Sequence, residues 1–309
     1  MSKANANANA NANANANANA NANANANASL TGILSSSIRC NTYKISKQAF
    51  IADVGHTIVP SRPSSGYAPY NARWDAEERA WVYVSEFTNA NRQWFGKLDA
   101  KARSVWNGWR SQQALTRAAQ ELIDYAGERE DRFAEIIDQH SGDGAINYWL
   151  GMLDIDAAKH PNTYLLIRVA RKIGEMAVMC LKNKFNAARP SALCPAIVPM
   201  IDPPGTPAYP AGHSLQAYLI SCLLIRAMPK VPQSKRPLRW DQPVTHKGLF
   251  ALSRRVADNR KIAGLHFDID NEAGFELAKM IDDWLHALPR NSQFKKLVAA
   301  AAAEFPQYK

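Results

Sequence analysis

The chain has 309 residues, 47% of them hydrophobic and 21% charged, which is the composition of a globular protein with a sizeable buried core. Its formal net charge of +10 at pH 7 favours anionic partners such as small phosphates, nucleic acid or a membrane surface. No nucleic-acid-binding motif and no apolar stretch of membrane-spanning length accompany that charge, so we expect neither nucleic-acid binding nor a membrane span.

The N-terminal part of the chain differs in composition from the rest. Residues 4–28 alternate strictly between Ala and Asn, and without large apolar side chains they cannot offset the entropy of ordering. We therefore predict that residues 1–28 are disordered. Residues 29–72, interrupted by three prolines, are predicted to form an extended arm, and residues 73–309 a helical domain.

From residue 74 onward, apolar residues recur at the three- and four-residue spacing of helices, and no strand-rich runs interrupt the pattern. The helix over residues 163–185 is apolar over a wide arc, which is typical of a helix packed on several sides. An all-α helical bundle follows. The predicted helices are 74–98, 102–126, 131–140, 163–185, one that begins near Gly212, 246–263 and 267–285.

The cysteines show no pairing typical of a disulfide framework or a zinc site. The four of them, Cys40, Cys180, Cys194 and Cys222, include no Cys-x-x-Cys pair, and two lie within apolar helical patterns. They are predicted to be small core side chains. Because the first residues also lack the apolar segment of a secretory signal, we expect a cytoplasmic protein.

Three segments at the edges of predicted core helices carry candidate functional residues. In the first, residues 182–190, Lys182 closes the apolar helix and Pro190 forces Arg189 into extended backbone. An ammonium and a forked guanidinium at one helix end suit a tetrahedral oxyanion. Basic residues also often do no more than complement a helix dipole, so this segment alone is compatible with a structural role.

The second segment is residues 209–214. Pro210 and Gly212 form a turn that opens a buried helix, whose first backbone N–H groups are free to bind an anion. His213, in the first turn, is placed to exchange a proton near neutral pH. A histidine at this position can equally cap or pack the start of the helix.

The third segment is residues 259–270. His266 and Asp270 are four residues apart, so on a helix their side chains share a face and can meet. A carboxylate on one imidazole nitrogen fixes the tautomer and leaves the other nitrogen as a nucleophile or a metal-type ligand. Arg260 adds a second forked donor. A surface His–Asp pair is the structural alternative.

In their order and internal spacing, the three segments resemble the superfamily of type 2 phosphatidic acid phosphatases, class A bacterial acid phosphatases and vanadium-dependent haloperoxidases. The pattern of that superfamily is Lys-x6-Arg-Pro, then Pro-Ser-Gly-His, then Ser-Arg-x5-His-x3-Asp. The resemblance spans about residues 165–285 and implies a helical bundle of the same type. The matching residues are Lys182, Arg189 and Pro190, then Pro210, Gly212 and His213, then Arg260, His266 and Asp270.

The resemblance implies hydrolysis of a soluble phosphate monoester through a phosphohistidine intermediate. His266 would attack phosphorus, oriented by Asp270, and His213 would protonate the leaving oxygen and then activate water. Such a reaction needs a small anionic substrate as its only partner, and no metal or other cofactor. The phosphate-binding groups would be Lys182, Arg189, Gly212 and Arg260.

Two positions depart from the pattern of the superfamily. Ala211 and Asn259 each stand where the superfamily has Ser. A hydrogen bond to a charged group is worth about 1.5–3 kcal/mol, so the missing hydroxyl at residue 211 would weaken anion binding or turnover roughly ten- to hundredfold. It would not abolish them, because the Gly212 N–H and three cationic side chains remain.

Two other functions stay open on the sequence. A vanadium-dependent haloperoxidase has the same blocks, with vanadate as a cofactor bound to His266 and with halide and peroxide as substrates. Vanadate adopts as a ground state the geometry that phosphate passes through in its transition state, so the blocks do not separate these two functions. The third is a non-catalytic anion-binding protein of the same fold, which Ala211 favours and the intact His213, His266 and Asp270 oppose. The pattern leaves the oligomeric state open.

Overall fold

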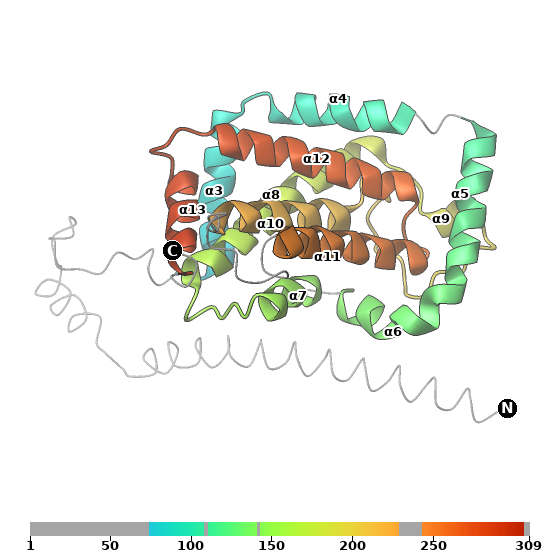
Figure 1. Cartoon of the computed structure of the whole chain (residues 1–309). Coiled ribbons are helices and arrows are strands. Elements are labelled where there is room, and N and C mark those ends of the chain that lie inside the picture. The colour runs from blue at the N-terminus through green and yellow to red at the C-terminus, as the bar shows by residue number, and fades with distance from the viewer. Residues whose placement is uncertain (1–73, 108–110, 141–142, 229–242, 306–309) are drawn as a thin grey trace, which may run out of the picture. The chain divides into compact units, whose positions relative to one another are not determined.

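Apolar stripes at helical spacing run through this chain, and the fold is built from the helices that bury them. The computed structural model describes residues 74–107, 111–140, 143–228 and 243–305 (Figure 1). No strand occurs in these ranges, which confirms the all-α prediction. The predictions for residues 1–28 and 29–72 lie outside the described residues, so the domain boundary at residue 73 stays a prediction.

The described elements are helical from end to end. They are α3 (Ala76–Ala90), α4 (Trp94–Trp106), α5 (Gln112–Asp124), the 3-10 turn η3 (Tyr125–Glu128), α6 (Arg129–Asp138), α7 (Gly144–Met152), α8 (Pro161–Phe185), α9 (Pro190–Leu193), α10 (Gly212–Ala227), α11 (Pro243–Ile262), α12 (Asp268–Ala287) and α13 (Gln293–Ala303).

The apolar pattern located the central helices well and the breaks between the outer ones less well. The predicted helix over residues 163–185 is α8, and the one predicted to begin near Gly212 is α10. A single helix over residues 74–98 is wrong, because α3 ends before Asn91, whose backbone and side-chain N–H groups both donate to the Phe87 carbonyl. Helices α7 and α13 were not predicted.

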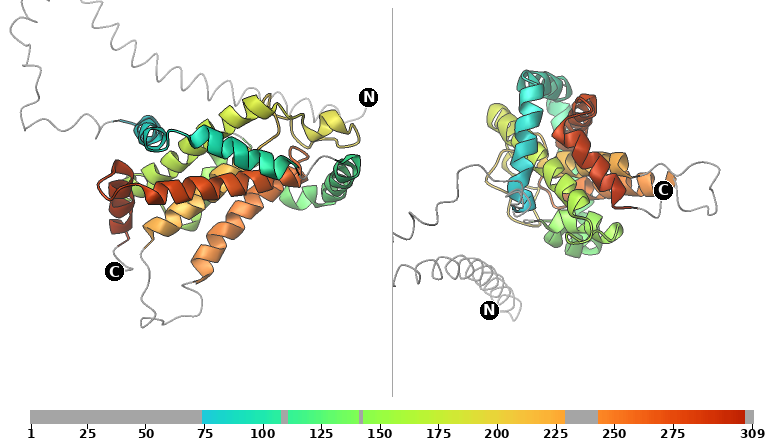
Figure 2. Two further views of the ribbon diagram at one scale, coloured as in Figure 1. Left: turned by 90° about the horizontal axis from the view of Figure 1, so that it is seen from above. Right: turned by 90° about the vertical axis from the view of Figure 1, so that its left-hand side faces the viewer.

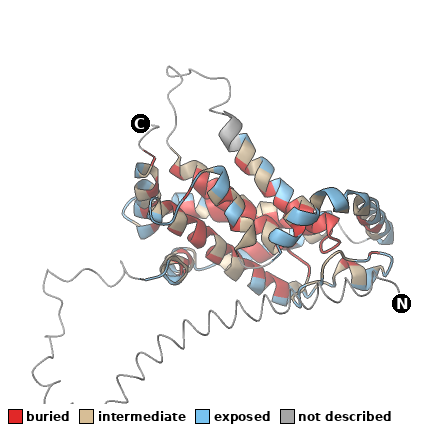
Figure 3. Cartoon of the chain, turned by 90° about the horizontal axis from the view of Figure 1, so that it is seen from below, coloured by how far each residue is buried: buried red, intermediate tan, exposed pale blue. Residues whose placement is uncertain are grey.

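Helix α10 is the central element, and it contacts α8, α11 and α12 (Figure 1). Most of its residues are buried, as expected for a helix without a polar face. Helix α4 runs along α12 on the outside of the bundle, as the two views of Figure 2 show. The buried residues follow the central helices (Figure 3), so the core surrounds α10.

Two glycines allow α8 and α12 to approach the first turns of α10. A Cβ on Gly174 would lie 2.9 Å from Leu215 Cδ2, and a Cβ on Gly274 would lie 2.8 Å from the Ala211 carbonyl oxygen. The Ala211 N–H also donates to the Asp270 carbonyl at 2.9 Å. The start of α10 is therefore held directly against the start of α12.

An aromatic cluster holds the segment that leads into α10. The Tyr209 ring packs edge-on against Trp106 and Phe185, with ring centroids 4.7 and 4.9 Å away. Its hydroxyl donates to the Ala102 carbonyl at 2.5 Å. These contacts fix the turn before Gly212 to α4 and to the end of α8.

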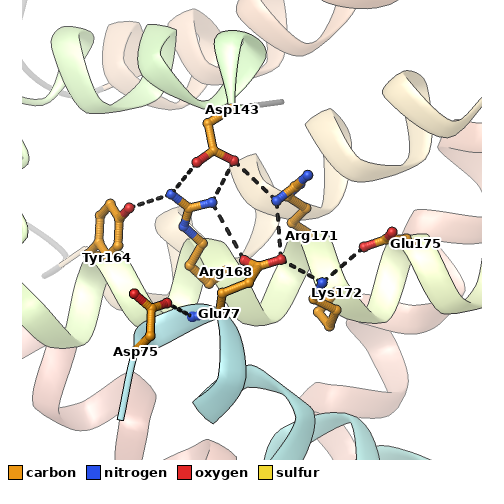
Figure 4. Close-up of polar contacts among 8 residues, drawn as sticks. All are labelled: Asp75, Glu77, Asp143, Tyr164, Arg168, Arg171, Lys172 and Glu175. Carbon is orange, nitrogen blue, oxygen red and sulfur yellow. Dashed lines mark hydrogen bonds and ion pairs between the residues drawn. The ribbon is translucent and has the colours of Figure 1, made fainter. Parts of the chain in front are cut away.

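A network of charged side chains joins α3, α8 and the start of α7 (Figure 4). Arg168 donates to both carboxylate oxygens of Asp143 at 2.6 Å. Glu77 pairs with Arg171 at 3.2 Å and with Lys172 at 2.5 Å. The Arg168 side chain is 9% exposed, so its charge is matched by carboxylates at a buried position. Because Asp143 directly precedes α7, the network fixes α7 beside α8.

We predict that Gly274→Ala destabilises the fold, because the added Cβ would clash with the Ala211 carbonyl and with Ser214 Cβ, each 2.8 Å away. The expected loss in the free energy of unfolding is about 1–3 kcal/mol, measured by chemical denaturation. Gly96→Ala in α4 is the control, since its Cβ meets nothing within 4 Å. That change should stabilise the helix by about 0.5–1 kcal/mol, and an equal effect of both variants would contradict the close approach.

Candidate active site

The seven predicted site residues meet at one end of the bundle. In Figure 1 this is the right-hand end, where α9 and the start of α12 lie near α5 and α6. Each residue stands at or next to a helix terminus. Lys182 lies in the last turn of α8, Arg189 precedes α9, Gly212 and His213 begin α10, Arg260 lies in the last turn of α11, His266 precedes α12, and Asp270 lies in its first turn.

Lys182 is a buried ammonium without a carboxylate partner among the described residues. Its side chain reaches back from α8 and donates to the backbone carbonyls of Pro207 and Ala208, the latter at 2.9 Å. The residue is 4% exposed. Burial, together with the charge of Arg189, lowers the pKa of Lys182 to about 7, while Asp270 opposes the shift.

Arg189 stands in extended backbone, with φ −71° and ψ 153°, because Pro190 follows it and begins α9. The sequence prediction for this turn is thus confirmed. Its guanidinium donates to the Thr206 carbonyl at 2.8 and 3.0 Å and to the Leu265 carbonyl at 3.1 Å. Another of its N–H groups meets His266 Nε2 at 3.0 Å. Burial lowers the pKa of Arg189.

The His266–Asp270 pair is present, with Nδ1 and Oδ2 3.1 Å apart. The prediction that both residues share the face of one helix is wrong, because α12 begins at Asp268 and His266 lies before it. The Asp270 carboxylate instead points back over the helix start, where it also accepts from the Phe267 N–H at 3.0 Å. This second bond acts as a cap and holds the carboxylate in place.

The neighbours of His266 fix its tautomer. A guanidinium can only donate, so the Nε2 that faces Arg189 must carry the lone pair, and Nδ1–H donates to Asp270. Burial and the charges of Lys182, Arg189 and Arg260 hold the pKa of His266 well below its usual range. Burial raises the pKa of Asp270 to about 7, which the Phe267 N–H and the nearby cations oppose. His266 is therefore a neutral imidazole with its Nε2 lone pair toward the cations.

The start of α10 offers backbone donors, as predicted for Gly212. Ala211 is the N-cap residue, and it has no side-chain group to bond the free amides of the first turn. His213 Nε2 lies 3.1 Å from the Gln139 carbonyl, so this nitrogen carries the hydrogen. Burial and the charge of Arg260 lower the pKa of His213 to about 3.

Arg260 is the most isolated charge in the site. Its side chain is 1% exposed, and one Nη2–H donates to the Ile136 carbonyl at 2.8 Å. Its Nε and Nη1 atoms are buried and have no hydrogen-bond partner in the part of the chain that the structure describes. Burial lowers the pKa of Arg260 to about 10, so the guanidinium stays charged at neutral pH. No carboxylate among the described residues pairs with it.

Helix α6 contributes to the site, and the sequence analysis missed this contribution. Its Ile136 carbonyl bonds Arg260 and its Gln139 carbonyl bonds His213. Asn259, which departs from the family pattern, donates to Glu135 at 3.0 Å and to Gln139 at 2.9 Å. The contacts of α6 with Arg260 and His213 join residues more than 70 positions apart, which no short sequence pattern reveals. The departure at Asn259 was the one sequence signal near these contacts.

Several further predictions concern the rest of the described chain. Cys180, Cys194 and Cys222 are free thiols, and Cys40 lies outside the described residues. Within the described ranges, no helix combines the length and the apolarity needed to cross a membrane. The same ranges contain no group of three or more His, Cys, Asp or Glu residues arranged to hold a metal ion.

Comparisons with known proteins identify no close relative. No family model and no curated protein matches the chain. Among solved structures, the chain is similar to a transmembrane PAP2-type phosphatidylglycerolphosphate phosphatase from Bacillus subtilis, with 16% identity and a TM-score of 0.29, over 70% of this chain and 99% of that chain.

We predict that oxyanion affinity falls as the pH rises above about 7, because the buried Lys182 then loses its proton. Sulfate is a suitable probe, since its own charge does not change in this range. The loss should approach about tenfold per pH unit where a single proton is coupled to binding. Lys182→Arg keeps its charge, so its affinity should fall less steeply. Titration calorimetry on both proteins tests this, and identical pH profiles would contradict the role of Lys182.

Proposed function

We propose that the chain is a phosphate-ester hydrolase that acts through a phosphohistidine on His266. The observation that carries the proposal is the buried Arg260 guanidinium, whose Nε and Nη1 have no partner within the described ranges. A buried charge without a counter-ion costs several kcal/mol, so the arrangement suits an anion that enters and neutralises it. Lys182 and Arg189 add two more cations that no carboxylate pairs with among the described residues.

His266 has the properties of the nucleophile. It is neutral, Asp270 holds Nδ1–H, and Nε2 carries the lone pair beside Arg189. An incoming phosphate oxygen would take over the Arg189 donor and free that lone pair. The Nε2–P bond would then form as the ester P–O bond breaks, with Arg260, Lys182 and the Gly212 N–H stabilising the charge on the phosphoryl oxygens.

His213 supplies the proton that the leaving oxygen needs. Without an anion it is neutral, because burial and Arg260 hold its pKa at about 3. A bound dianion offsets the repulsion from Arg260 and raises the pKa of His213, which then gains a proton at Nδ1. In the second step the neutral His213 accepts a proton from the attacking water, the N–P bond breaks, and inorganic phosphate leaves.

The sequence pattern supports the same roles. The three blocks that resemble the phosphatase and haloperoxidase superfamily supply each group that the reaction needs, in the same order. They stand at helix termini that the fold brings together, although the segments are separated by up to 88 positions, from Lys182 to Asp270. A soluble phosphate monoester is the substrate class we propose.

One observation also favours the haloperoxidase alternative. The unprotonated Nε2 of His266 is a suitable nitrogen ligand for a metal oxyanion, and the surrounding cations fit vanadate as well as phosphate. Bound vanadate would supply the activation of peroxide, and the chain's own part would be to hold the anion. The residues that would hold it are Lys182, Arg189, Gly212, Arg260 and His266.

We predict that His266→Ala abolishes the hydrolysis of p-nitrophenyl phosphate, because no nucleophile remains to accept the phosphoryl group. His286→Ala is the matched control, since His286 is an exposed histidine on the same helix as Asp270 and should leave the rate unchanged. Retained activity in His266→Ala would contradict the assignment.

The same preparations should be assayed for bromination with vanadate and peroxide. Hydrolysis without bromination is the expected result. Bromination without hydrolysis would identify the haloperoxidase, and the absence of both activities would leave anion binding as the function of the site.

A further inference from the structure

Gln139 is an unusual residue at the end of α6. Its two neighbours, Asp138 and His140, are exposed, but Gln139 is 1% exposed. Glutamine is rarely buried to this extent unless its amide is satisfied by hydrogen bonds. We therefore expect both the oxygen and the nitrogen of the Gln139 amide to need hydrogen-bond partners.

The hydrogen bonds around Asn259 fix which way the Gln139 amide faces. Asn259 Nδ2 donates to the Glu135 carboxylate at 3.0 Å, and a carboxylate can only accept, so this atom is the nitrogen. The same Nδ2 meets Gln139 Oε1 at 2.9 Å, and Asn259 Oδ1 accepts from Arg132 at 3.3 Å. Gln139 must therefore present its oxygen to Asn259 and direct its Nε2 elsewhere.

Gln139 Nε2 is buried and has no hydrogen-bond partner in the described residues. The Tyr148 hydroxyl lies nearby: burial and Asp138 raise the pKa of Tyr148, and a side-chain hydrogen bond from Gln139 lowers it. That contact does not reach the distance and angle of a full hydrogen bond, so it does not satisfy Nε2. An unsatisfied buried donor is destabilising by about 1–3 kcal/mol. An amide held in this way is free to donate to an acceptor that a ligand supplies.

The surroundings of Gln139 identify the kind of acceptor. Its backbone carbonyl bonds His213, and the Ile136 carbonyl, one turn earlier on α6, bonds Arg260. Nε and Nη1 of Arg260 have no partner among the residues that the structure describes. The end of α6 thus carries the unpartnered amide of Gln139, and its Ile136 carbonyl holds the guanidinium of Arg260. An oxyanion oxygen is the acceptor that fits both.

We propose that Gln139 Nε2 is an additional anion-binding donor, which bonds an oxygen of the bound phosphate beside Arg260. This inference rests on the proposed function, because it assigns one more ligand to the same anion. The Gln139 amide would also supply a side-chain hydrogen bond to the anion, which Ala211 cannot supply because it has no hydroxyl. Asn259 is then a positioning residue, since its Nδ2 holds Gln139 Oε1 and so aims Nε2 toward the anion.

The test compares two substitutions of Gln139 with wild type. Gln139→Leu keeps the approximate volume and removes the donor. Gln139→Glu keeps an oxygen for Asn259 and places a carboxylate oxygen where Nε2 was, which under this inference faces the open N–H groups of Arg260. Gln112→Glu, an exposed residue at the start of α5, is the control for the change in charge. Titration calorimetry with inorganic phosphate and thermal unfolding with and without phosphate are measured for all four proteins.

We expect Gln139→Leu to bind phosphate about ten- to hundredfold more weakly than wild type, which is the effect of one lost bond to a charged group. Gln139→Glu should melt at a higher temperature than wild type without phosphate, because its carboxylate pairs with Arg260. It should also lose the stabilisation that phosphate gives the wild type. Gln112→Glu should behave as wild type in both measurements.

The outcomes separate this inference from the proposed function. If wild type binds phosphate and Gln139→Leu binds it equally well, the role of Gln139 is overturned and the anion site stands. A Gln139→Glu variant that is less stable than wild type, or that still gains stability from phosphate, overturns it too, even if Gln139→Leu does not fold. Wild type that binds no phosphate overturns the anion site itself, and the role of Gln139 with it.

Discussion

The site depends on positive charges that the protein buries and holds without neutralising them. The acceptors of their hydrogen bonds are neutral backbone carbonyls. Lys182 donates to Pro207 and Ala208, Arg189 donates to Thr206, and Arg260 donates to Ile136. Carbonyls orient an ammonium or a guanidinium without pairing its charge. The Arg168 network shows the contrast, because there carboxylates pair with the cations.

The fold brings these buried charges together because several helices begin or end at the same end of the bundle. Small residues make this possible, since Gly174 and Gly274 let α8 and α12 lie against the start of α10. The free amides of α10 then face the region where α8 and α11 end, and the cap formed by Asp270 holds His266 beside them. The Asp270 carboxylate orients His266, and it is hydrogen-bonded to His266 and Phe267 instead of to a cation.

Sequence reasoning could name these candidate residues because they lie in three short, ordered segments. Helix-end signals alone left Lys182 and Arg189 compatible with a structural role, and the resemblance of the three ordered segments to one pattern made them site candidates. Pro190 gave the extended turn correctly. The pairing of His266 with Asp270 was also predicted, but on a shared helix face, because four-residue spacing does not reveal that the carboxylate caps the helix start. The part played by α6 was not predictable, since Gln139 meets Asn259 across 120 positions and an isolated Gln in an amphipathic helix carries no local signal.

The central claim is that an oxyanion neutralises the buried cations, and a crystal structure of the protein soaked in tungstate tests it most directly. Tungsten scatters strongly enough for the anion to be located without ambiguity. We predict one tungstate with oxygens within hydrogen-bond distance of Arg260 Nε and Nη1 and of the Gly212 N–H, and its metal facing His266 Nε2. Tungstate found only on the surface, with Arg260 paired to a carboxylate of the chain, would contradict the account.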